Sequence, residues 1–234
     1  MDKTLPKDLP QAHKVLVVDD HPLFREALAT RIVLEPGIAE CREASGAQET
    51  RKLLANETFS LLIVDLSLAD GTGLELIRRL RSEGHRLPIL VVSALEESVY
   101  GERAFRAGAQ GFINKMESPA RLMAAIHAVM AGELYLSPTV GKSMALASAR
   151  KIGEGSGIES LSDREMQIFS LLGKGHGTRE IAEMLFLSPH TIESHRERIR
   201  AKLGLRNSMA LVQSATQWAM QEVGLLRGVT SAAD

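Results

Sequence analysis

The sequence predicts two domains, a doubly wound α/β domain with a five-stranded parallel sheet and a small all-α domain behind it. Strand patterns and helix patterns alternate five times in the first half of the 234-residue chain. Such alternation of apolar strands with helices is typical of a parallel sheet covered on both faces. Past residue 157 the strand patterns stop and four helix patterns follow. A Ser-, Gly- and Ala-rich segment between the two parts is typical of a flexible linker.

In the first domain each expected strand is a short apolar run, and each expected helix has apolar residues at helical spacing. Gly84 ends one helix, whereas Gly101 weakens another, because glycine costs about 1 kcal/mol in a helix interior. Ser118 and Pro119 begin the last helix as N-cap and first residue. The five strand-helix pairs are expected at 14–18 and 22–35, 38–44 and 47–57, 59–65 and 73–83, 87–93 and 96–108, and 109–115 and 118–133.

The second domain has helix start signals and short loops. Ser162 and Glu165 have the spacing of a capping box, and Ser188 with Pro189 forms another N-terminal signal. Short helices separated by "GKGHG" and "LFLS" fit a helix-turn-helix. Helices are expected at 163–175, 178–186, 189–204 and 207–224, and the domain bounds at 13–132 for the first domain, 133–157 for the linker and 158–226 for the second domain.

The composition narrows the class of protein. Apolar residues make up 44% of the chain, enough for buried cores, and a net charge of −1 indicates neither a nucleic-acid nor a membrane partner. The single cysteine, Cys41, excludes an internal disulfide and a Cys-rich zinc site. The N-terminal segment "MDKTLPKDLPQAHK" lacks the apolar core of a signal peptide, and no apolar run has the length of a membrane span. We therefore expect a cytoplasmic protein without a membrane partner.

Polar side chains follow the apolar strands. Asp19 and Asp20 end the first strand, Asp65 the third, Ser93 the fourth and Lys115 the fifth. The carboxyl ends of parallel strands form the edge where α/β proteins bind ligands, so these side chains are expected to gather there. Neighbouring carboxylates repel one another, and a hard divalent cation, above all Mg²⁺, suits oxygen ligands. A carboxylate in such a site can act as a nucleophile toward a phosphoryl group.

Three of these residues also have a plain structural explanation. Asp20 could cap the helix that follows the first strand. Ser93 could simply end its strand, and Lys115 could be solvated.

The segments "VLVVDDHPLFREAL", "LLIVDLSLADGTGLEL", "ILVVSAL" and "GAQGFINK" resemble, in order and spacing, the receiver domain of two-component response regulators. The resemblance implies a flavodoxin-like fold and the following roles: Asp65 as phospho-acceptor, Asp19, Asp20, Asp65 and the backbone carbonyl of Ser67 as ligands of Mg²⁺, Ser93 as switch hydroxyl, Lys115 as partner of the phosphoryl group, and Phe112 as switch aromatic. Phe112 could equally be a core residue. Ala69 stands where the family usually has proline, so the loop should be less rigid.

Residues 157–222 resemble the LuxR-type DNA-binding domain, and the two domains together resemble the NarL/FixJ subfamily of response regulators. The resemblance implies a transcription regulator and no enzyme activity. Its expected partners are a sensor histidine kinase, double-stranded promoter DNA and, on activation, a second copy of the chain, and it leaves RNA polymerase open as a further partner.

The helix at 189–204 is expected to read DNA. Ile192, Ile199 and Leu203 fall on its core side. His190, Ser194, Glu197 and Arg198 face the other way as candidates for base edges, and Thr191, Arg200 and Lys202 flank them as candidates for phosphate contacts. The helix carries a net charge of +2, but residues 158–234 are formally neutral, so a solvated face without a ligand is the alternative. Glu193 stands where the family often has lysine.

Two other functions fit parts of the sequence. A Mg²⁺-dependent aspartate phosphohydrolase would use Asp65 as nucleophile. Such enzymes typically have a second aspartate two residues further on, where this chain has Ser67. The other alternative is a receiver-regulated protein whose helical domain binds protein or RNA.

Overall fold

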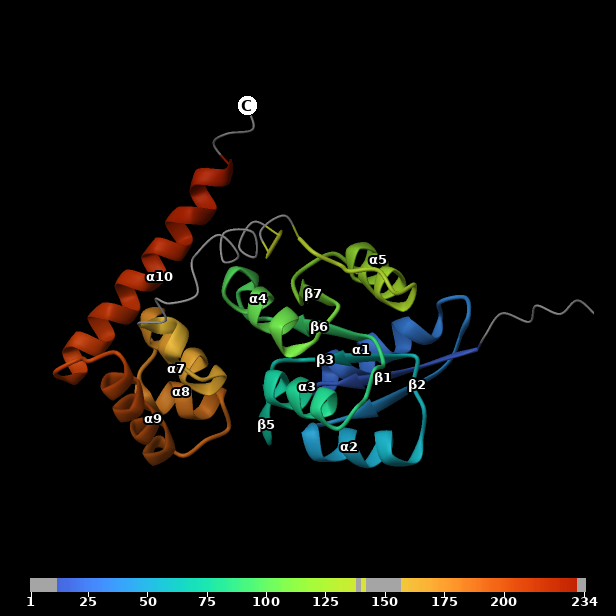
Figure 1. Ribbon diagram of the computed structural model, residues 1–234, viewed down its shortest axis with the longest axis horizontal. Coiled ribbons are helices and arrows are strands. Elements are labelled where there is room, and N and C mark those ends of the chain that lie inside the picture. Colours follow the sequence, from blue (N-terminus) through green and yellow to red (C-terminus); the bar gives the residue numbers. More distant parts are fainter. Residues whose placement is uncertain (1–11, 138–139, 142–156, 231–234) are drawn as a thin grey trace, which may run out of the picture. The chain divides into compact units, whose positions relative to one another are not determined.

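The computed structural model of this chain describes residues 12–137, 140–141 and 157–230, without the side chains of 221–230. The chain forms two compact units, Met1–Leu146 and Ala147–Asp234 (Figure 1). The N-terminal segment that was expected to contain no signal peptide (1–14) lies mostly outside the described residues, and so does most of the expected linker (133–157).

The first unit is a doubly wound α/β fold, as predicted. Its parallel sheet has the strand order β2-β1-β3-β6-β7, which is the flavodoxin-like order. Figure 1 shows α5 on one side of this sheet and α2 and α3 on the other. The elements are β1 (His13–Val18), α1 (Pro22–Val33), β2 (Ile38–Ala44), α2 (Ala47–Asn56), β3 (Leu61–Val64), α3 (Gly73–Ser82), β6 (Ile89–Ser93), α4 (Glu97–Ala107), β7 (Gly111–Asn114) and α5 (Pro119–Met130).

A small antiparallel hairpin between β3 and α3 was not predicted. It pairs β4 (Ser67–Leu68) with β5 (Gly71–Thr72). Strands of two residues are too short to produce an alternating pattern, so the sequence offered no signal for them. The hairpin lies directly after Asp65.

The main core lies between the sheet and the helices α1 and α5. Alternate strand residues such as Val15, Ile63 and Ile113 pack there with Ile32 of α1 and Ile126 of α5. The residues between them on each strand, which include Leu16, Leu62 and Phe112, are equally buried and face the opposite helical layer. Burial on both faces explains why these strands are apolar throughout.

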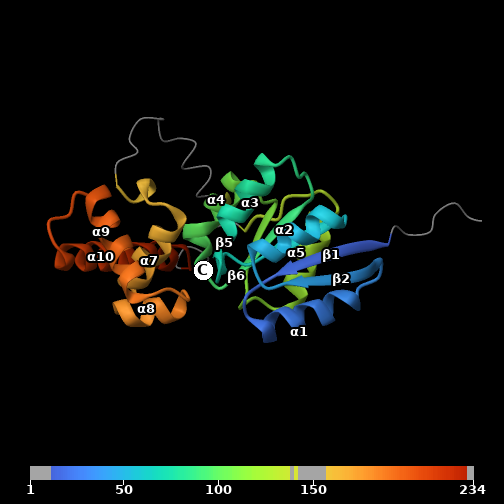
Figure 2. The ribbon, with the colours of Figure 1, turned by 90° about the horizontal axis from the view of Figure 1, so that it is seen from below.

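The second unit is helical. It contains a 3-10 turn, η1 (Ile158–Ser160), and the helices α7 (Asp163–Gly173), α8 (Thr178–Met184), α9 (Pro189–Lys202) and α10 (Ser208–Thr230), which Figure 2 shows grouped together. The rings of Phe169 and Trp218 pack at a centroid distance of 5.7 Å. The expected end of the last helix at residue 224 was wrong, because one glycine weakens a helix but does not end it. Within the described ranges, no helix combines the length and the apolar character that crossing a membrane requires.

The predicted helix start signals are present in both units. The Ser118 side chain accepts a hydrogen bond from the Arg121 amide, and the Ser188 side chain accepts one from the Thr191 amide. Ser162 and Glu165 form the reciprocal capping box at the start of α7. Each bond satisfies an amide that the first turn of a helix leaves unpaired.

Gly101 makes room for a residue that follows α5. A Cβ atom at Gly101 would lie 2.3 Å from a methyl group of Val140, and Val140 is buried against this site with 1% exposed. Just before it, the Tyr135 amide donates to the Gln110 carbonyl at 2.9 Å, which places this part of the chain beside β7. Helix α4 therefore carries a glycine because Val140 occupies the space of a side chain.

Gly101→Ala is expected to lower the melting temperature, although alanine is the better helix former by about 1 kcal/mol. The added methyl overlaps Val140, and overpacking costs about 1–3 kcal/mol. In a Val140→Ala background the same change should become neutral or stabilising. Thermal unfolding of the two single variants and the double variant checks this. Additive effects would mean that the two residues do not share this space.

Candidate functional site

Asp65 lies at the carboxyl end of β3 and is buried, with 2% of its side chain exposed. Its Oδ1 atom accepts hydrogen bonds from the Ser93 hydroxyl at 2.7 Å and from the Ser67 amide at 3.3 Å. Its Oδ2 atom lies 2.7 Å from Lys115 Nζ. The structure thus brings together the predicted acceptor, hydroxyl and lysine from the ends of three parallel strands.

Lys115 bridges two carboxylates. Besides Asp65, its ammonium contacts Asp19 Oδ2 at 2.6 Å, and it lies 4.6 Å from the centre of the Phe24 ring. Burial alone would lower the pKa of Lys115, but the charges of Asp65 and Asp19 raise it above the ordinary value. Lys115 is therefore a fixed positive charge in the pocket, and the solvated alternative is wrong.

The Asp20 carboxylate is buried, and few favourable contacts offset the cost of removing its charge from water. Its side chain is 7% exposed, and Oδ1 accepts no hydrogen bond among the described residues, although His21 Nδ1 lies 2.8 Å away. Burial raises the pKa of Asp20, and although His21 opposes this rise, Asp65 and Asp19 add to it. The pocket therefore has a deficit of positive charge at Asp20.

His21 is a member of the cluster that sequence reasoning missed. Ligand atoms of Asp19, Asp20, His21 and Asp65 all lie within 4.8 Å of one another. The available signal was the position of His21 directly after the aspartate pair. His21 is also the N-cap residue of α1, which has no side-chain cap, so the alternative that Asp20 caps this helix is wrong.

Two further predicted residues lie near the pocket or in the core. Ser67 belongs to β4 and points its amide at Asp65, while the role of its carbonyl as a metal ligand stays a prediction. Phe112 on β7 is 1% exposed. Its position is that of a packed core residue, and its role as a switch stays a prediction.

In the second unit, α9 has the two faces that the helical wheel predicts. Ile192 and Ile199 are fully buried, and Leu203 is half-buried. On the opposite face His190, Glu197 and Arg198 are exposed, and Ser194 is half-buried. The first residue of this face, His190, directly follows Pro189, the first residue of the helix.

Arg196 and Glu193 form a network with α8. The Thr178 hydroxyl donates to Glu193 Oε1 at 2.6 Å, and Arg196 Nη1 lies 3.1 Å from the same oxygen. Glu193 thereby joins α8 to α9.

Lys202 has a partner inside the second unit. Its ammonium lies 2.6 Å from Glu165 Oε2 and donates to the Ser160 carbonyl at 3.2 Å. Burial would raise the pKa of Glu165, but the hydrogen bonds from Lys202 and Ser162 together hold it below the ordinary value. The expected phosphate contact of Lys202 would therefore compete with a nearly buried carboxylate.

Two of the basic side chains on α9 could contact a bound ligand. Arg198 is exposed and Arg200 is half-buried, and neither has an ion pair with any residue that the structure describes. Thr191 shares a hydrogen bond with the Ser188 hydroxyl at 2.8 Å.

Comparison with known proteins identifies both units. Residues 15–127 match the family of response regulator receiver domains, and residues 159–215 match the bacterial regulatory proteins of the luxR family. A putative transcriptional regulator of Pseudomonas aeruginosa is 34% identical over 86% of this chain and 96% of its own length. The transcriptional regulatory protein UhpA of Escherichia coli is 33% identical over 85% of this chain and 95% of its own. This chain belongs to the NarL/FixJ response regulators.

The response regulator also shares its fold with a solved structure. RcsB of Salmonella enterica serovar Typhimurium, bound to promoter rprA in the presence of phosphomimetic BeF3−, has a TM-score of 0.57 and 23% sequence identity. The match covers 88% of this chain and 99% of that one. At this identity the likeness concerns the fold alone. The family as a whole consists of transcription regulators with two-component kinases and promoter DNA as partners.

Receivers of this family bind Mg²⁺ in their acidic pocket, and the pocket of this response regulator fits such an ion. Its donors are carboxylate oxygens, the ligand type that Mg²⁺ prefers. The buried Oδ1 atom of Asp20, which accepts no hydrogen bond among the described residues, would coordinate the ion there. Asp19, Asp20 and Asp65 are the side chains that would hold it.

Proposed function

We propose that this response regulator is a cytoplasmic, DNA-binding transcription regulator that a sensor histidine kinase switches by phosphorylating Asp65. The observation that carries the proposal is the pair of contacts on Asp65, with the Ser93 hydroxyl on one oxygen and the Lys115 ammonium on the other. We assign residues 13–132 to the receiver, 133–157 to the linker and 158–226 to the DNA-binding domain.

The proposed step is a nucleophilic displacement at phosphorus. A carboxylate oxygen of Asp65 attacks the phosphoryl group of a phosphohistidine, a P–O bond forms, the P–N bond breaks, and the imidazole leaves. Asp19, Asp20, Asp65 and the Ser67 carbonyl would hold Mg²⁺, which would neutralise part of the charge on the phosphoryl group. Lys115 pairs with one phosphoryl oxygen, and Ser93 donates its hydroxyl to another.

The kinase is proposed to dock beside the pocket. Leu23 and Met116 are 85% and 87% exposed. They adjoin Phe24 and Lys115, which contact each other at the pocket. Large exposed apolar side chains next to a reactive group favour a protein partner at this place.

Phosphorylation is proposed to shift an equilibrium between two arrangements of the receiver. The phosphoryl group adds about −1.5 to −2 charges. The Lys115 ammonium and the Ser93 hydroxyl can move toward these charges. Their movement changes the packing around Phe112, between β7 and α4. A complete shift requires about 5.5 kcal/mol of differential affinity, so a partial shift is expected.

The exposed face of α9 is proposed to enter the major groove of promoter DNA. The candidates for base edges are His190, Ser194, Glu197 and Arg198, with Thr191 and Arg200 on phosphates. The exposure of Arg198 and its freedom from ion pairs within the described part of the chain support this role. Lys202 is proposed to have a structural role in place of the phosphate contact, because its ammonium is paired with Glu165.

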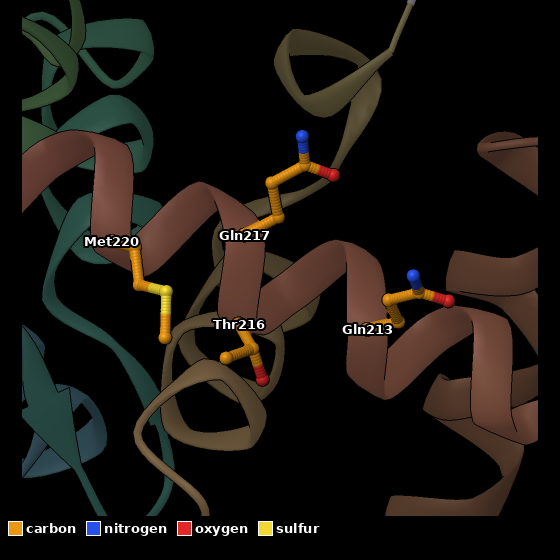
Figure 3. A pocket seen from close by; sticks show the side chains of 4 residues that line it. All are labelled: Gln213, Thr216, Gln217 and Met220. Atoms are coloured by element: carbon orange, nitrogen blue, oxygen red, sulfur yellow. The ribbon is translucent and has the colours of Figure 1, made fainter.

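Helix α10 is proposed to form the dimer contact on activation, and RNA polymerase remains a further proposed partner. Met209, Val212 and Met220 are exposed along α10 at 80%, 38% and 69%. Thr216 and Met220 point to the same side of the helix (Figure 3), and both belong, with Gln213 and Gln217, to the lining of a pocket. Exposed apolar residues at helical spacing favour packing against a second helix.

Light scattering with and without beryllofluoride, a phosphoryl mimic, tests this switch. The molar mass is expected to rise from that of a monomer toward that of a dimer when Mg²⁺ and beryllofluoride are added. Met220→Glu should prevent the rise, whereas Leu34→Glu, at a similarly exposed site after α1, should not. An unchanged mass with beryllofluoride bound would contradict the proposed dimer.

A further inference from the structure

The N-terminus of α2 is capped by a residue from the loop that follows Asp65. The N-cap of α2 is Gly46, which provides no side-chain cap of its own. The first two amides of the helix, those of Ala47 and Gln48, donate to Asp70 Oδ1 at 2.8 Å and Oδ2 at 2.9 Å. Both oxygens of Asp70 therefore satisfy helix amides that belong to another part of the chain.

Gly46 is fitted to this contact. A Cβ atom at position 46 would lie 2.5 Å from Asp70 Oδ1. The backbone of Gly46 is extended, at φ −177° and ψ −176°, which any residue can adopt, so conformational freedom is not the reason for a glycine here. The close approach of the Asp70 carboxylate is the reason.

Asp70 lies in the turn of the β4–β5 hairpin. Ser67 pairs with Thr72, and Leu68 pairs with Gly71, so Ala69 and Asp70 form the turn. The first residue of the hairpin contacts the proposed phospho-acceptor, because the Ser67 amide donates a hydrogen bond to Asp65. The turn at Asp70 is thus connected through two short strands to Ser67, whose amide contacts the acceptor.

The hairpin is held at its other end as well. The Gly73 amide donates to the Leu66 carbonyl at 2.9 Å, and Thr72 and Glu75 form the capping box of α3. The turn residue Ala69 stands where a proline would fix φ. In this chain the contact of Asp70 with α2 supplies a restraint at the same turn.

We propose that Asp70 is a positioning residue that holds the acceptor loop, and with it the metal-binding backbone of Ser67, in place of the missing proline. This role rests on the proposed function of Asp65 and Ser67. Replacing a residue that orients a metal ligand without touching the metal typically lowers metal affinity about 10–100-fold. Because Asp70 acts through the backbone of a hairpin, we expect an effect at the lower end, about tenfold.

The test compares Asp70→Ala with the double variant Ala69→Pro/Asp70→Ala in the full chain. Glu133→Ala, which removes one exposed carboxylate behind α5, is the charge-matched control. Calorimetry measures Mg²⁺ affinity, and hydrogen exchange measures protection of the Ala47 and Gln48 amides.

Asp70→Ala should expose both amides to exchange and weaken Mg²⁺ binding about tenfold, with Glu133→Ala unchanged. Ala69→Pro should restore Mg²⁺ affinity in the double variant and leave the amides unprotected. A purely structural cap would not produce this separation of the two readouts.

Two results would overturn the role of Asp70. One is Mg²⁺ affinity at the wild-type level in Asp70→Ala despite lost amide protection, which would limit Asp70 to a helix cap. The other is a double variant that binds Mg²⁺ no better than Asp70→Ala. A wild-type protein without Mg²⁺ affinity would instead overturn the proposed function, and the positioning role with it.

Discussion

Replacement of Asp65 by asparagine is expected to abolish phosphorylation of the protein by acetyl phosphate and Mg²⁺. The amide oxygen of asparagine is not a nucleophile toward phosphorus, and Asp65 is the carboxylate that contacts both Ser93 and Lys115. Asparagine can still accept the Ser93 hydrogen bond, and Asp19 still pairs with Lys115, so the receiver should stay folded. Intact-mass measurement should show one added phosphoryl group on the wild-type protein and none on the variant.

Asp20→Ala is a separate test of the same pocket, because it removes a proposed Mg²⁺ ligand without removing the acceptor. The buried Asp20 carboxylate lacks a hydrogen-bond partner among the described residues at Oδ1, and its loss relieves repulsion from Asp65 and Asp19. The variant should therefore keep its fold and lose Mg²⁺ affinity. Labelling of Asp65→Asn at the wild-type level would remove Asp65 from the acceptor role.

Arg198→Ala is expected to weaken binding to the preferred DNA sequence by about 1–3 kcal/mol, roughly 5- to 150-fold, and to relax the preference at one base pair. The side chain is exposed, lies in the middle of α9, and faces away from the buried Ile192 and Ile199. DNA sites selected from a random pool, and then titrated with wild type and variant, provide the measurement. Circular dichroism checks that the variant is folded.

Lys202→Ala is the matched variant on the same helix. It leaves the nearly buried Glu165 without its cation, so we expect a lower melting temperature. The base preference should stay unchanged, as should the dependence of binding on salt. A loss of about one unit in the salt slope would restore Lys202 as a phosphate contact. Altered base preference in Lys202→Ala together with equal loss on all sequences in Arg198→Ala would contradict the assignment of the two faces of α9.

The order of strands and helices could be predicted because hydrophobic periodicity is a local property of the chain. The gathering of Asp65, Ser93 and Lys115 followed from it, since the ends of parallel strands meet at one edge of the sheet. The helical periodicity of α9 also predicted its buried side correctly for Ile192 and Ile199, which are fully buried.

Contacts between side chains distant in sequence could not be predicted. The pairing of Lys202 with Glu165, and the capping of α2 by Asp70, depend on how separate elements pack. No periodic pattern carries that information. The β4–β5 hairpin was missed because its strands have two residues each. His21 was missed because a histidine after two aspartates has no distinctive spacing.

The central claim, that phosphorylation of Asp65 controls DNA binding, is tested most directly by titrating one selected DNA site with wild type and Asp65→Asn. Each protein is measured before and after treatment with acetyl phosphate and Mg²⁺. Treatment is expected to tighten DNA binding of the wild-type protein and to leave Asp65→Asn at the affinity of the untreated protein. Equal affinity of treated and untreated wild-type protein, with the phosphoryl group present by mass, would contradict the claim.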